Sequence, residues 1–185
     1  MKTFVTSATL AAAILALGAC SKGADGNAAA PAQTSEAQKA AGDKTVAAGL
    51  DVNGKFMAAA KAAGLDQTLA GPGPYTVIVA DDAAFTGLPA GTYDNWLKPE
   101  NRAQLTKVLT NMILPGTVLA EDISKAIDNG KGKAVLATMG GGTLTATKDG
   151  DKIVLTSADG KKATVTKADD KFTNGVVHHV DAVLM

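Results

Sequence analysis

The chain changes its hydrophobic pattern twice along its length. One early lysine precedes an apolar run that ends near residue 20, and residues 21–44 contain no large apolar side chain. From about residue 45 to residue 130, apolar residues recur at intervals of three and four, which predicts helices. Beyond Lys131 the period becomes two, which predicts short strands with one buried face.

Three helical segments are predicted by this periodicity, at residues 53–65, 101–112 and 120–130. Gly64 stands where the first helix would stop, and Pro115-Gly116 ends the second segment. Residues 75–79, YTVIV, form an apolar, β-branched run that predicts a strand. Asp81 follows this strand and is expected to cap a short helix that runs to Phe85.

The C-terminal part is predicted to consist of antiparallel strands joined by tight turns. Four short runs, KAVLATM, GTLTAT, DKIVLT and KATVTK, are rich in Val, Leu, Ile and Thr. Asp149-Gly150 and Asp159-Gly160 are hairpin turn signals between them. Gly140 to Gly142 lack the Lys-Ser/Thr of a phosphate-binding loop, so we interpret them as a flexible turn. Helices followed by antiparallel strands predict the α+β class.

Two blocks of the sequence resemble the conserved blocks of the fasciclin domain family. The first is YTVIVADDAAF, which includes Asp81, Asp82 and Phe85. The second is NGVVHHVDAVL, which includes Asn174, Gly175, His178 and Asp181. The resemblance covers about residues 46–185 and implies a twisted β-sandwich or wedge with several helices packed around it. It also implies that the last block is a core strand.

The sequence departs from the family pattern at two places. Ala80 and Asp81 stand where the family has Pro and Thr, and either Asp or Thr can cap a helix. Asn111-Met112 replaces the family's Tyr-His pair, in a region that is tied to integrin binding in animal members. We therefore carry no integrin-type function over to this chain.

The N-terminal region resembles the leader of a bacterial lipoprotein. Leu17-Gly18-Ala19-Cys20 is similar to a lipobox, which implies a signal peptide at residues 1–19 and acyl chains such as palmitate on Cys20. Cys20 is the only cysteine, so no intramolecular disulfide is possible. The alternative is a chance cysteine at the end of an ordinary signal peptide. Residues 20–44 are expected to be a flexible tether, and residues 45–185 the folded domain.

The predicted location is the cell envelope, with the lipid anchor in a membrane. Ser21 follows the cysteine where Asp would suggest retention in the inner membrane. Outer-membrane or periplasmic location is therefore favoured for a cell with two membranes. Lys and Arg together number 18, as do Asp and Glu, so the charge pattern does not indicate nucleic-acid binding.

His178 and His179 are the two histidines of the chain, and they are adjacent. Successive side chains of a strand point to opposite faces, so the two rings are not expected to hold one metal ion together. No metal and no cofactor are therefore predicted. We interpret His178 as a structural, hydrogen-bonded residue. His179 is expected to face a groove or solvent, with Asp181 close enough to influence its charge state.

The predicted function is that of a membrane-anchored adhesion module, monomeric as a domain, that binds a protein or a glycan. Trp96 and Tyr93 are candidate contact residues, although Trp96 is also interpretable as a buried core residue. A small-ligand carrier with an apolar cleft is the alternative. An envelope hydrolase is less favoured, and no enzyme is predicted, because Ser157 lies in a predicted turn and not in a nucleophile elbow.

Overall fold

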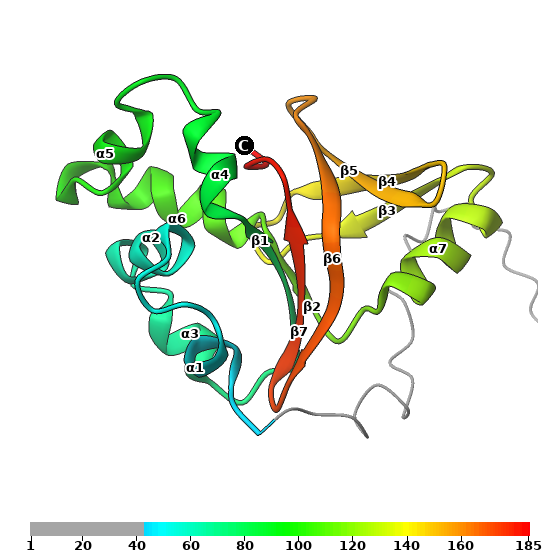
Figure 1. Cartoon of the computed structure of the whole chain (residues 1–185), viewed down its shortest axis with the longest axis horizontal. Coiled ribbons are helices and arrows are strands. Elements are labelled where there is room, and N and C mark those ends of the chain that lie inside the picture. Colours follow the sequence, from blue (N-terminus) through cyan, green and yellow to red (C-terminus); the bar gives the residue numbers. More distant parts are fainter. Residues whose placement is uncertain (1–42) are drawn as a thin grey trace, which may run out of the picture.

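A curled, seven-stranded sheet runs through the middle of the molecule (Figure 1). The computed structural model describes residues 43–185, so the predicted signal peptide, Cys20 and nearly all of the tether lie outside the described residues. In chain order the strands are β1 (Tyr75–Ala80), β2 (Ile113–Pro115), β3 (Lys133–Ala137), β4 (Thr143–Asp149), β5 (Lys152–Ser157), β6 (Lys162–Phe172) and β7 (Gly175–Val180). Their order across the sheet is β2-β1-β7-β6-β5-β4-β3.

The two outer strands of this sheet come close to each other, so the sheet is almost a closed barrel. The amide of Met139, just after β3, donates to the carbonyl of Ile113 in β2 at 2.8 Å. The amide of Gly140 donates to the carbonyl of Thr110 at 3.0 Å. These bonds partner backbone groups that an open sheet edge would leave exposed.

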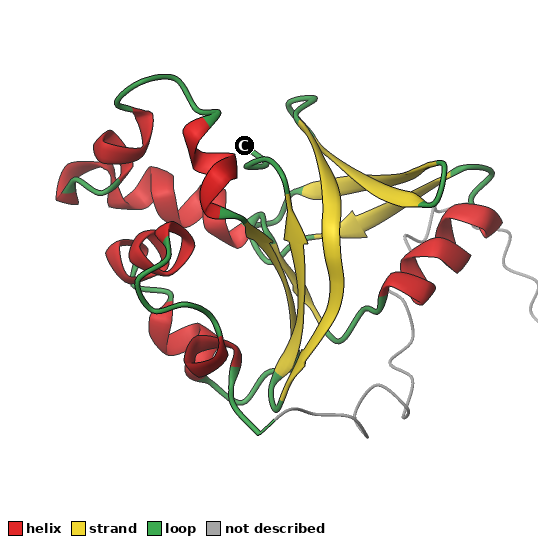
Figure 2. Cartoon of the chain, viewed as in Figure 1, coloured by secondary structure: helices red, strands yellow, loops and turns green. Residues whose placement is uncertain are grey.

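Six α-helices and one short 3-10 helix form a lobe on one side of β1 and β7 (Figure 2). They are α1 (Val46–Gly49), α2 (Lys55–Ala63), α3 (Asp66–Ala70), α4 (Asp82–Thr86), α5 (Thr92–Trp96), η2 (Pro99–Asn101) and α6 (Arg102–Thr110). The remaining helix, α7 (Ala120–Asn129), lies apart from this lobe and packs against β3 and β4.

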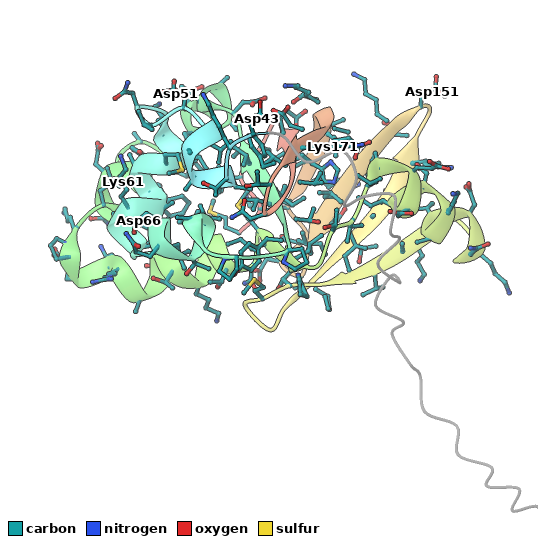
Figure 3. All side chains as sticks on the ribbon, turned by 90° about the horizontal axis from the view of Figure 1, so that it is seen from below. Asp43, Asp51, Lys61, Asp66, Asp151 and Lys171 are labelled. Atoms are coloured by element: carbon teal, nitrogen blue, oxygen red, sulfur yellow. The ribbon has the colours of Figure 1, made fainter. Side chains whose placement is uncertain are left out.

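The burial of each strand follows from what covers its two faces. In β1 every residue after Tyr75 is buried, and in β7 every residue except His179 is buried, because both strands are covered on both sides. In β3 buried and exposed residues alternate, which is the pattern of a strand with one solvated face. Charged side chains project from the surface, among them Lys61 and Asp66 on the helical lobe and Asp151 between β4 and β5 (Figure 3).

Helix α2 ends as its sequence predicts. Gly64 follows it with φ of 77°, in the left-handed region where glycine replaces other residues at little cost. The last carbonyls of the helix then need partners from elsewhere. Two side chains of α6 donate to the carbonyl of Ala63: Arg102 Nε at 3.3 Å and Thr106 Oγ1 at 3.2 Å. These bonds join the two longest helices of the lobe.

The α+β class is confirmed, but one feature of the sheet differs from the sequence prediction. Strand β1 pairs with β7 in parallel, from Tyr75 opposite Gly175 to Ala80 opposite Val180. The other strand pairs are antiparallel. The strand that the pattern placed among the helices is thus central to the sheet, next to the last strand of the chain.

The start of the described chain is fixed against the turn between β6 and β7. Lys44 O accepts a hydrogen bond from the amide of Thr173 at 2.9 Å. The amide of Val46 donates to Asn174 Oδ1 at 2.8 Å, and the Val46 side chain is completely buried. The domain therefore joins its predicted tether at this end of β6.

Candidate functional site

His178 is a completely buried residue of β7 with a hydrogen bond on each ring nitrogen. Its Nδ1 accepts from the amide of Asp169 at 3.2 Å, and its Nε2 donates to Val118 O at 2.8 Å. An acceptor role for Nδ1 places the single proton of the neutral ring on Nε2. Burial lowers the pKa of His178, while the bond to Val118 and the carboxylate of Asp169 act in the opposite direction.

Asp169 connects this histidine to the start of α7. It lies at an irregularity in the pairing of β6 with β7, where its φ is 60°. Its Oδ1 accepts from the amide of Ala120, the first residue of α7, at 2.8 Å. Asp169 thus caps a helix 49 residues earlier in the chain, although it lies in a strand itself. The role of His178 and Asp169 is to hold β6, β7 and α7 together.

Asn174 and Gly175 perform a similar task at the other end of β7. The side chain of Asn174 accepts from the amide of Val46 and donates to the carbonyls of Leu69 and Gly71 at 2.8 and 2.7 Å. Gly175 lies so close to the backbone of Tyr75 that a Cβ atom would overlap the Tyr75 carbonyl. Both motif residues therefore have structural explanations.

His179 points to the opposite side of β7, toward the helical lobe, and is partly exposed. Its Nδ1 is 3.1 Å from Asp81 Oδ1, and its Nε2 is 3.6 Å from Asp170 Oδ2. A carboxylate only accepts, so Nδ1 is the donor to Asp81. Asp181, which the sequence suggested as the neighbour of His179, uses its Oδ1 to accept from the amide of Thr164 at 2.7 Å instead.

The expectation that Asp81 caps the helix after it is wrong. Asp81 is the N-cap residue of α4 but makes no side-chain capping bond. Its two carboxylate oxygens are taken by His179 and by Thr166 Oγ1, the latter at 3.1 Å. Asp82 serves a different helix, accepting from the amide of Lys55 at the start of α2 at 2.8 Å. Phe85, the last motif residue of this block, is buried.

A small hollow lies beside His179, between β1 and α2. Its volume is about 140 Å³, with a wall that includes Phe56, Met57 and Val79. Asp51, Asp81 and Asp82 also line it, so its rim is acidic. Among residues 43–185 no cluster of three or more His, Cys, Asp or Glu side chains is placed to hold a metal ion.

A larger hollow, of about 420 Å³, lies between α5, α6 and the turn that joins β5 to β6. Trp96 lines it, but this side chain is only 5% exposed. The interpretation of Trp96 as a core residue is therefore favoured over that of an exposed contact residue, because its ring is packed within the helical lobe. Only a small part of the indole is open to a ligand.

Tyr93 also has partners inside the domain. Its hydroxyl donates to Lys55 O at 2.9 Å, and its ring meets that of Phe85 edge to face at 5.2 Å between centroids. Lys55 Nζ lies 5.7 Å from the Tyr93 ring centre. Burial, followed by the charges of Asp82 and Asp94, raises the pKa of the Tyr93 hydroxyl. Tyr93 thus joins α5 to α2 and forms no shared aromatic patch with Trp96.

Asn111 contacts the glycine-rich turn between β3 and β4. Its Oδ1 accepts from Thr138 Oγ1 at 3.0 Å and lies where a Cβ atom on Gly140 would have to be. Gly140 and Gly142 are thus needed for close packing against Asn111, and Gly141 for its φ of 80°, so the three glycines are not simply a flexible turn. Met112, which the sequence change also introduces, is completely buried. Sequence reasoning identified Asn111 as a departure but not its position on the larger hollow.

Ser157, the serine considered above as a nucleophile, makes no hydrogen bond to a histidine. Ser157 Oγ donates to Met185 O at 3.3 Å and accepts from the amide of Lys161 at 3.2 Å. His178 and Asp181 use their polar atoms elsewhere. The part of the chain that the structure describes also contains no helix long and apolar enough to cross a bilayer.

Comparison with known proteins gives a consistent result. The family model for the fasciclin domain matches residues 53–185. Protein sll1483 of Synechocystis sp. is 34% identical over 141 residues, which cover 76% of this chain and 71% of that protein. Transforming growth factor-beta-induced protein ig-h3 of Sus scrofa is 33% identical over 129 residues, which cover 69% of this chain but only 17% of that protein.

A solved structure shares the fold. It contains a domain pair from the insect cell adhesion molecule fasciclin I, and it superposes with a TM-score of 0.65 at 17% sequence identity. The match covers 77% of this chain and 51% of the fasciclin I chain, so this chain spans about half of that structure. At this identity the likeness concerns the fold alone.

Proposed function

This chain belongs to the fasciclin domain family, and from that membership we propose that it is an adhesion module of the cell envelope that binds a protein or glycan partner. The match of the family model to residues 53–185 is the observation that carries the proposal. Fasciclin I, which shares the fold, is a cell adhesion molecule. The mode of action we propose is binding without chemical turnover.

The hydrogen bonds of the polar residues around β7 support binding in preference to catalysis. The side chains of His178, Asp169 and Asn174 form hydrogen bonds with backbone groups of neighbouring elements. A catalytic base instead needs a nucleophile or a substrate proton within hydrogen-bond reach. The two surface hollows beside the helical lobe are the places where a partner would bind.

We further propose that the domain is displayed on a membrane by lipid attached to Cys20. The matched region amounts to a single fasciclin domain, so avidity would come from many molecules on one surface. Residues 20–44 would then separate the domain from the bilayer. The larger hollow is the observation that favours the second candidate, a carrier of a small ligand.

The experiment is capture of a partner by soluble protein that starts at Lys44. The protein is immobilised, incubated with material from intact cells and, in parallel, applied to a glycan array. Heat-unfolded protein is the matched control. A partner retained by the folded form alone supports the proposal, and equal retention by both forms contradicts it.

Salt provides a second criterion for the same partner. Because positive and negative side chains are equal in number, we expect binding to change little when the salt concentration is raised. A steep loss of binding with salt would instead indicate a contact of nucleic-acid type, driven by opposite charges.

A further inference from the structure

The larger hollow has the size and position of a ligand site. Its volume of about 420 Å³ falls within the roughly 300–1,000 Å³ that small-molecule sites occupy, whereas the hollow beside His179 falls below it. Helices α5 and α6 form one side of it, and Asp159 in the β5–β6 turn and Met185 form the other. Figure 1 shows the C-terminal segment between the helical lobe and this turn.

Polar groups on its wall are available to a ligand. Within residues 43–185, the side chains of Gln104, Lys107 and Asp159 make no hydrogen bond or ion pair. Asn111 uses its Oδ1 to accept from Thr138, which fixes the amide and leaves its NH₂ group as a donor. The hollow thus offers amide donors, an amide acceptor, an ammonium group and a carboxylate around one space.

The apolar part of the wall is small. It is supplied by the small exposed part of Trp96 and by the partly buried Val108 and Met185. Lys107 and Asp159 carry opposite charges, so the charged side chains of the wall sum to zero. A ligand with several hydroxyl groups and one weakly apolar C–H face matches the small apolar area and the balanced side-chain charges of the wall. A purely apolar ligand would leave the polar groups without partners.

We propose that this hollow binds one sugar residue of a neutral glycan. The inference rests on the proposed function and names the class of partner that the domain would hold. Asp159 and the amides of Gln104 and Asn111 bind the hydroxyl groups, and the exposed part of Trp96 lies against the sugar ring. Lys107 donates to a hydroxyl or ring oxygen at the opening.

Trp96 is the only tryptophan of the chain, so its fluorescence reports directly on this hollow. The full chain is kept in a detergent without a sugar headgroup and titrated with neutral disaccharides, with a uronic acid as the charged comparison. We expect a saturable change in Trp96 emission with at least one neutral sugar. A change of the same size with the uronic acid alone would overturn the assignment to a neutral ligand.

Two variants locate the binding. Asp159→Asn and Gln104→Ala are each expected to weaken the sugar about tenfold, because a lost hydrogen bond to a charged or amide group costs about one decade of affinity. Asp151→Asn is the matched control, since Asp151 is also an exposed aspartate, lies in the turn at the other end of β5 and does not line the hollow. Equal affinities for all three variants would overturn the site.

The two proposals fail in different ways. If no neutral sugar changes Trp96 emission while the protein still captures a partner, the sugar site is wrong and the adhesion function stands. If a sugar binds but no cell-surface partner is captured, the adhesion function is wrong and the chain is a carrier of a small ligand.

Discussion

The amide of Asp169 donates to Nδ1 of His178, across nine residues of chain, from a backbone position with φ of 60°. This contact determines which tautomer the buried ring adopts, and it fixes the irregular part of β6 over β7. The carboxylate of the same Asp169 caps α7. One pair of residues thus determines how the helix at one end of the molecule meets the central strands.

The first prediction compares the two adjacent histidines. His178→Ala is expected to lower the free energy of unfolding by about 1–3 kcal/mol, because it leaves the buried carbonyl of Val118 and amide of Asp169 without partners. His179→Ala is the matched control and is expected to cost less, since its ring is partly exposed. Urea unfolding of both variants measures the difference, and equal losses would contradict the prediction.

The second prediction concerns pH. Burial lowers the pKa of His178 in the folded state from its ordinary value of 6.5, so the unfolded state binds its proton first as the pH falls. The contribution of His178 to stability is therefore present above about pH 6.5 and is lost progressively below it, down to the folded pKa.

This pH effect is measured by thermal unfolding between about pH 8 and pH 5, in the His179→Gln background, which leaves His178 as the one histidine of the chain. Adding His178→Gln should flatten the dependence between about pH 6.5 and pH 5. An unchanged slope would show that His178 is not the group responsible.

The third prediction tests the backbone position of Asp169. Asp169→Ala should destabilise the domain by about 2 kcal/mol, through the lost cap of α7 and the left-handed backbone that alanine adopts poorly. Asp169→Asn should retain most of the stability, since Asn tolerates this conformation. Asp170→Ala, which removes an exposed pair with Lys167 and a 3.6 Å contact with His179, is the control and should cost under about 1 kcal/mol.

The fourth prediction concerns the turn before β7. Asn174→Ala removes three hydrogen bonds of a buried side chain and should cost about 3 kcal/mol. Thr173→Ala, at the exposed neighbouring position, should cost little because its amide still reaches Lys44. Chemical denaturation decides between them, and a mild effect of Asn174→Ala would mean that these bonds are replaced by water.

The fifth prediction concerns the membrane anchor. Protein extracted from membranes should begin at Cys20 and have the mass of a lipidated chain. Cys20→Ala should leave the precursor uncleaved or release it from the membrane fraction. Intact-mass measurement on both forms is the test, and an unmodified mature start at another residue would exclude the lipid anchor.

The sequence predicted those elements whose signals are local. The apolar run of β1 and the alternating C-terminal strands appear where their patterns placed them, and Gly64 ends α2. The parallel pairing of β1 with β7 joins residues about a hundred positions apart, so no window of sequence contains it. Family resemblance identified both strands as important but did not state their register.

The incorrect predictions of site residues also arise because the contacts involved join distant parts of the sequence. Local rules assigned Asp81 to the helix after it, whereas Thr166 and His179 reach it from 85 and 98 residues away. Trp96 became a candidate contact residue because aromatic side chains often carry binding energy at interfaces, but residue type does not distinguish a surface position from a core position. The larger hollow involves α5, α6, a hairpin turn and the last residue, so sequence reasoning had no signal for it.

The bond between Lys44 and Thr173 has a consequence for how the domain stands on a surface. It fixes the point where the tether joins the domain at one end of β6, while Asp159 and the larger hollow lie at the other end of that strand (Figure 1). Eleven residues of extended chain span roughly 30 Å. A domain anchored through residue 44 would therefore present the hollow to the surroundings of the cell, and the end that carries α1 and the β6–β7 turn to the bilayer.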